Sequence, residues 1–177
     1  MSADSLSDEA RAQVWLIGAV HDTLAAEGMR GWLFGGWGLD ARVGRISREH
    51  GDVEFWVERV HATRSRDVLI AAGANTLATQ PPEESYEFTW NGVQFSTAYF
   101  DQGPDGWYTV QGRWADWTFP PDSFEDDLQE LQGTPVRVMS VAGMLAMKEQ
   151  YPHLRKGRPL RPKDVEDLTI LRRLSTR

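Results

Sequence analysis

Apolar residues recur along the chain with two spacings, one typical of helices and the other typical of strands. Helical spacing fills the segment between Ser7, a suitable N-cap, and Gly28, a suitable helix stop. The same spacing predicts further helices over residues 37–43, 61–72, 141–151 and 163–173. Short apolar or alternating runs predict strands over residues 31–34, 52–57, 86–90, 93–100 and 134–139. The chain therefore mixes helices with strands.

Asn91-Gly92 separates two of the predicted strands and is a strong signal for a two-residue hairpin turn. A turn of that length pairs Trp90 with Val93, and so places Glu87 opposite Ser96. Together with the predicted helices, this hairpin indicates an α/β fold whose sheet is mixed and mostly antiparallel, with helices packed on it.

Length and composition fit one globular domain. The chain has 177 residues, which suffice for a single core. We expect a sheet core over about residues 1–138 and a helical C-terminal part over about residues 139–177. The sequence contains no cysteine, which excludes disulfides and thiolate metal sites.

Charge and hydropathy narrow the choice of partners. The net charge of −7 argues against a nucleic-acid partner and would attract a cationic small molecule. No apolar run approaches the length that spans a membrane, and the polar, acidic N-terminus does not resemble a secretory signal. We therefore expect a cytoplasmic protein without a membrane partner. Its oligomeric state is open, and a homodimer is compatible with the sequence.

The candidate functional residues lie in two neighbouring stretches of the chain. Gly35 and Gly36 follow a predicted strand and open a predicted helix, an arrangement that lets the backbone approach a phosphate. Asp52 and Glu54 stand two positions apart on the next strand and so share one face. Paired carboxylates of this kind suit Mg²⁺ bound together with substrate phosphates. Taken singly, the glycine pair also fits a plain turn, and the carboxylate pair also fits a solvated strand face.

The run GGWGLDARVGRISREHGDVEF resembles the signature of the small antibiotic nucleotidyltransferases. These are the lincosamide nucleotidyltransferases and the aminoglycoside-2''-adenylyltransferase group, within the polymerase-beta-like nucleotidyltransferase superfamily. The chain departs from the pattern at Glu54, where the family usually has aspartate. It matches at Gly35, Gly36, Trp37, Asp40, Arg48, His50 and Asp52.

The resemblance implies a polymerase-beta-like nucleotidyltransferase fold and an enzyme of antibiotic resistance. Such an enzyme moves a nucleoside monophosphate from a nucleoside triphosphate, with ATP the expected one, to a hydroxyl of an aminoglycoside or a lincosamide. It depends on magnesium, which Asp52 and Glu54 would hold as catalytic residues. The resemblance further implies that the nucleotide is bound by Gly35, Gly36, Arg48, His50 and Lys148. Without the resemblance, Lys148 reads as a surface lysine.

A third carboxylate, which the superfamily usually carries on the strand beside the carboxylate pair, is missing. Ser96 or Thr97, depending on register, stands in that place, and neither serves as a general base at neutral pH. Glu87 and Asp101 are the candidate replacements. We favour Glu87 as the catalytic base because the hairpin register brings it beside Ser96. The alternative is a non-catalytic nucleotide-binding module with a degraded nucleotidyltransferase site.

Two further segments have open interpretations. The aromatic segment, residues 107–119, forms either a buried sheet face or a wall for a bound ring system. The acidic segment, residues 122–130, fits a solvated helix face, or an attraction for ammonium groups if it borders the cleft.

Overall fold

The computed structural model describes residues 6–77, 81–154 and 156–176. Each predicted helix is present within a few residues of its expected bounds. They are α1 (Asp8–Ala26), α2 (Gly35–Val43), α3 (Ala62–Ala72), α4 (Val141–Leu154) and α5 (Pro162–Leu174). The Ser7 side chain caps α1 by accepting a hydrogen bond from the Ala10 amide at 3.1 Å. No helix within these ranges is long and apolar enough to cross a membrane.

The central sheet is mixed, as expected. Its strands run in the order β1 (Gly31–Leu33), β2 (Val53–Glu58), β5 (Val93–Gln102), β4 (Ser85–Trp90) and β3 (Asn75–Leu77). Only the β2–β5 pairing is parallel among the strand pairs of the described residues. Beyond the end of β5, two short strands continue the sheet, β6 (Tyr108–Thr109) and β7 (Thr118–Phe119). A separate hairpin consists of β8 (Leu128–Leu131) and β9 (Thr134–Arg137).

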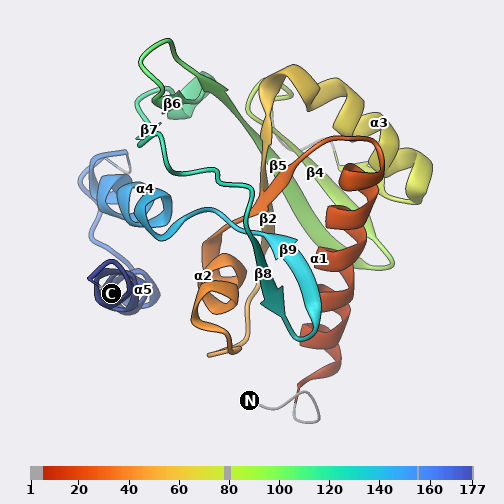
Figure 1. Ribbon diagram of the computed structural model, residues 1–177, viewed down its shortest axis with the longest axis horizontal. Coiled ribbons are helices and arrows are strands. Elements are labelled where there is room, and N and C mark those ends of the chain that lie inside the picture. Colours follow the sequence, from red (N-terminus) through yellow and green to blue (C-terminus); the bar gives the residue numbers. More distant parts are fainter. Residues whose placement is uncertain (1–5, 78–80, 155, 177) are drawn as a thin grey trace.

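The two faces of the sheet have different chemistry because side chains alternate along each strand. Phe55 and Tyr99 belong to the face that lies against α1 and α3, and both are fully buried. The opposite face carries Glu54, Trp56 and Ser96. In Figure 1, α4 and α5 lie on the other side of the molecule from α1 and α3. The polar side chains of the sheet therefore face the C-terminal helices.

The strand register shows which residue stands where the superfamily usually carries its third carboxylate. The Asn91-Gly92 turn is as tight as predicted, so Trp90 pairs with Val93 and Glu87 with Ser96. On its other side, Ser96 pairs with Glu54. Thr97 points to the buried face, where its hydroxyl lies 2.8 Å from the Tyr99 hydroxyl. Ser96, and not Thr97, thus stands beside Glu54 on the same face of the sheet.

The acidic segment is not a helix, which corrects the favoured interpretation. Residues 122–127 contain no helix or strand, and 128–131 form β8, because a tight turn with positive φ at Gln132 (51°) and Gly133 (79°) pairs them with β9. Asp126 contacts Arg30, and Asp127 contacts Arg42 at 2.9 Å. These carboxylates are therefore engaged by arginines.

Candidate active site

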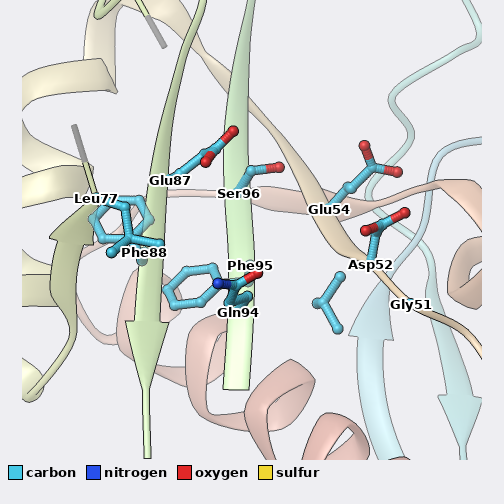
Figure 2. A pocket seen from close by; sticks show the side chains of 10 residues that line it. Gly51, Asp52, Glu54, Leu77, Glu87, Phe88, Gln94, Phe95 and Ser96 are labelled. Atoms are coloured by element: carbon cyan, nitrogen blue, oxygen red, sulfur yellow. The ribbon is translucent and has the colours of Figure 1, made fainter. Parts of the chain in front are cut away.

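A row of polar side chains crosses the central strands. The register places Glu54, Ser96 and Glu87 side by side on β2, β5 and β4. Figure 2 shows the Ser96 hydroxyl between the two glutamates, with Asp52 just below Glu54 and its carboxylate turned the same way. Burial, and then the charge of Asp52, raise the pKa of Glu54 to about 7. Two carboxylates this close are stabilised by a cation between them.

The glycine turn lies directly against these carboxylates. Gly35 has a φ of +68°, which favours glycine, and a Cβ on it would lie 2.8 Å from Oε2 of Glu54. A Cβ on Gly36 would lie 2.6 Å from Cε1 of the His50 ring and 3.2 Å from Nη2 of Arg48. The space that we expected phosphate to use is therefore shared with His50 and Arg48.

The His50 ring lies between an aspartate and an arginine. Its Nε2 lies 2.6 Å from Oδ2 of the buried Asp40, and its Nδ1 lies 2.9 Å from Nη1 of Arg48. A guanidinium can only donate, so Nδ1 must accept and Nε2 must carry the proton. Asp40 also accepts hydrogen bonds from the amide and hydroxyl of Ser47. Asp40 therefore orients both His50 and Ser47, which lies in the loop before β2.

Lys148 is buried, so its interpretation as a surface lysine is wrong. Its Nζ donates to Asp164 at 2.9 Å and to Asp167 at 2.7 Å, which joins α4 to α5. Asp167 also accepts from Arg48 at 3.4 Å, and Asp164 from Arg161 at 2.6 Å. Although burial acts in the opposite direction, the hydrogen bonds from Arg161 and Lys148 lower the pKa of Asp164. A chain of charges thus connects the C-terminal helices to the glycine turn.

Three cavities meet at Glu54. One, of about 120 Å³, is polar and is lined by the glycine pair and four cations, Arg48, Lys148, Arg161 and Lys163. The second, of about 180 Å³, lies over the Asp52, Glu54, Ser96 and Glu87 row and is shown in Figure 2. The third, of about 240 Å³, has aromatic walls and also includes Glu54 and Glu87.

The predicted site residues are brought together in these cavities. Each of the following lines at least one of them: Gly35, Gly36, Arg48, His50, Asp52, Glu54, Glu87 and Lys148. Asp101 is elsewhere, at the far end of β5, where it accepts from Arg59 at 2.7 Å. Sequence reasoning missed Asp167, since no local pattern marks an acid that contacts two cations distant in the chain. Arg161 and Lys163, which are not among the predicted nucleotide-binding residues, also line the polar cavity.

The aromatic segment divides between the two interpretations. Phe119 is fully buried and Trp107 is 43% exposed. Trp114 and Trp117, by contrast, line the third cavity. Part of the segment is thus core, and part forms the wall of a cavity beside Glu54.

This fold is that of the nucleotidyltransferases. The solved structure of ANT(2'')-Ia in complex with adenylyl-2''-tobramycin matches with a TM-score of 0.72 and 16% identity, covering 93% of this chain and 94% of that one. Lincomycin-bound LnuA, a lincosamide antibiotic adenylyltransferase, matches with a TM-score of 0.67 and 18% identity, covering 92% and 96%.

Comparison of the sequence with family models identifies the family of this chain. The model of the aminoglycoside-2''-adenylyltransferase family matches residues 16–171, and the chain belongs to this family. Two 2''-aminoglycoside nucleotidyltransferases, from Klebsiella pneumoniae and Escherichia coli, are each 45% identical over 39 residues. That stretch covers 20% of this chain and 22% of each relative, so the direct sequence match spans about a fifth of their length.

The contact between Gly36 and His50 leads to a prediction about stability. Gly36→Ala forces the imidazole away from its place, and overpacking of this kind costs about 1–3 kcal/mol. We expect a lower melting temperature, measured by circular dichroism. In the double variant Gly36→Ala/His50→Ala the imidazole is gone, so the additional cost of Gly36→Ala should largely vanish. Purely additive losses would mean that the two residues do not compete for this space.

Proposed function

We propose that this chain transfers a nucleoside monophosphate from a nucleoside triphosphate, with ATP the expected donor, to a hydroxyl of a small molecule in a magnesium-dependent reaction. The observation that carries the proposal is the row of Glu54, Ser96 and Glu87 beside Asp52, which lies between a cationic cavity and an aromatic one. Membership of the aminoglycoside-2''-adenylyltransferase family supports it.

Asp52 and Glu54 fit a magnesium ion whose coordination shell is completed by oxygens of the substrate. Among the described residues, no group of three or more histidine, cysteine or acidic side chains could hold a metal. Asp52 and Glu54 would therefore provide the protein's own ligands, as is usual for Mg²⁺ shared with phosphates. When bound, the ion would neutralise charge on the triphosphate and help to orient it. Burial and the charge of Asp52 raise the pKa of Glu54 although Lys148, Lys163 and Arg161 act in the opposite direction, so these cations do not fully compensate the carboxylate pair.

Phosphate binding would fall to the polar cavity. The amides at the start of α2 favour an anion, and Arg48 and Lys148 supply positive charge at the same place. His50 would act through Arg48, because both of its ring nitrogens already have protein partners. Arg161 and Lys163 line the same cavity and would share the charge of the leaving pyrophosphate.

The transfer itself needs one bond made, one bond broken and one proton moved. The acceptor oxygen forms a bond to the α-phosphorus while the bond between that phosphorus and the bridging oxygen to the β-phosphate breaks. Pyrophosphate leaves with the electron pair of the broken bond. Glu87, next to Ser96, would take the proton of the acceptor hydroxyl as general base.

A transfer assay tests this proposal. Nucleoside triphosphates labelled at the α-phosphate are incubated with the protein, Mg²⁺ and one of two acceptors. These are lincomycin, the ligand in one solved structure named above, and tobramycin, whose adenylyl derivative is the ligand in the other. We expect label on an acceptor and release of pyrophosphate. Magnesium-dependent nucleotide binding without transfer to any acceptor in a broader panel would instead support the non-catalytic binding module.

The pKa of Glu54 predicts how magnesium binding depends on pH. Burial raises this pKa from 4.5 to about 7, so between these pH values the folded metal-free protein holds a proton that the unfolded chain releases. The stability that this proton contributes to the fold is fully present below pH 4.5 and is lost as the pH rises through about 7. Magnesium needs the ionised form, and its affinity should fall about tenfold per pH unit below 7.

Melting temperatures with Mg²⁺ and with EDTA, recorded one unit below and one unit above this pKa, provide the measurement. The stabilisation by Mg²⁺ should be larger at the higher pH in the wild type. In Glu54→Gln it should be small and independent of pH. A wild-type stabilisation that is equal at both pH values would remove Glu54 from the metal site.

A further inference from the structure

The cavity on the Glu87 side of Glu54 has aromatic walls. Trp56 stacks on Phe34 with ring centroids 4.9 Å apart, and Trp117 stacks on Trp114 at 5.4 Å. Tyr151, from α4, lies 5.7 Å from Trp117. These rings come from β2, the chain before α2, α4 and the segment around residues 112–117, yet all of them line one cavity of about 240 Å³.

Three carboxylates line this cavity, and each has either a partner in the protein or a role in the proposed reaction. Glu84 is bound by Arg113, through a 2.8 Å ion pair and a 2.6 Å hydrogen bond from the Arg113 amide. Glu54 belongs to the proposed magnesium site, and Glu87 is the proposed base. The acidic segment at residues 122–130 contributes no residue to this cavity. A ligand with several ammonium groups would therefore find few carboxylates there to pair with.

Two indole donors in these walls have no hydrogen-bond acceptor among the residues that the structure describes. Nε1 of Trp56 and Nε1 of Trp117 are buried and lack a hydrogen-bond partner, and both residues are more than nine-tenths buried. Both Nε1 atoms are closed to solvent, so an oxygen of a ligand in the cavity would reach either one only if its ring turned. The ring faces that line the cavity are therefore what favours a ligand with an apolar face.

We propose that this cavity binds the acceptor of the reaction, and that the acceptor is a hydroxylated molecule with an apolar face and at most one ammonium group. The inference rests on the proposed transfer function, because only that function requires an acceptor on the Glu87 side of Glu54. It narrows that function by excluding polyamines as good ligands. Trp114, half-buried beside Trp117, is the specificity-determining residue that can be changed with least effect on the core.

Calorimetric titration of two probes tests the ligand class. Lincomycin carries one basic amine and an alkyl-substituted ring, whereas tobramycin carries amino groups on each of its rings. We expect lincomycin to bind more tightly to the wild-type protein, with little dependence on salt. Trp114→Ala should weaken its binding about tenfold or more. Trp114→Phe, which keeps a ring, should retain most of the affinity.

Trp107→Ala is the matched control, because Trp107 is exposed and does not line the cavity. It should bind lincomycin like the wild type. Tighter binding of tobramycin, no binding of lincomycin, or equal losses in Trp114→Ala and Trp107→Ala would each overturn the inference.

Pyrophosphate release, measured separately, distinguishes the proposed ligand class from the proposed transfer function. Transfer to tobramycin that is unaffected by Trp114→Ala would overturn the ligand class alone, whereas lincomycin binding without release of pyrophosphate would overturn the transfer function.

Discussion

Asp52→Asn is expected to abolish magnesium-dependent binding of ATP while leaving the fold intact. Asp52 is exposed, and asparagine has the same shape, so packing should not change. What disappears is one of the two charged ligands that we assign to the metal. The variant also removes a charge that raises the pKa of Glu54, so the remaining carboxylate should ionise at a lower pH.

Calorimetric titration of ATP with and without Mg²⁺ measures this effect. Asp22→Asn is the control, since Asp22 is an exposed aspartate on α1 outside the three cavities described above. It should bind as the wild type does, and all three proteins should melt at similar temperatures. Unchanged magnesium-dependent affinity in Asp52→Asn would remove Asp52 from the metal site.

Glu87→Gln should slow nucleotidyl transfer by about 10²- to 10⁴-fold, the usual value of general-base assistance. ATP binding should change little, because Glu87 lies outside the cationic cavity. Asp101→Asn should have no comparable effect. Asp101 is five residues beyond Ser96, roughly 16 Å along an extended strand, and is paired with Arg59.

A gain-of-function variant makes this test sharper. Ser96→Asp would place a carboxylate on β5 beside Glu54, in the position that the superfamily usually fills. In the Glu87→Gln background it should restore part of the lost rate. Equal rates in Glu87→Gln, Asp101→Asn and the wild type would show that neither carboxylate acts as the base.

Much of this geometry follows from local sequence. The pairing of Glu87 with Ser96 was predictable because Asn91-Gly92 fixes both the length of the turn and the register of the hairpin. The shared face of Asp52 and Glu54 follows from strand periodicity. The predicted helices agree with the structure because their apolar spacing and terminal signals point to the same bounds.

The rest depends on tertiary contacts that no local pattern encodes. Lys148 looks like a surface lysine until α5 packs beside α4 and brings two aspartates to it. The sequence does not show that the loop between α2 and β2 places the His50 imidazole against Gly36. The acidic segment was misread because the charge pattern of residues 122–130 resembles a helix face, whereas the turn at Gln132-Gly133 selects a hairpin.

The central proposal is that Asp52, Glu54 and Glu87 form one site for magnesium-dependent nucleotidyl transfer. A single-turnover experiment tests it most directly, with protein in excess over ATP labelled at the α-phosphate and with lincomycin as the acceptor. We predict that the label moves to the acceptor with one pyrophosphate released per transfer in the wild type. The label should move far more slowly in Glu87→Gln and not at all in Asp52→Asn. Label that stays on ATP in the wild type while Mg²⁺-ATP and acceptor are both bound would contradict the proposal.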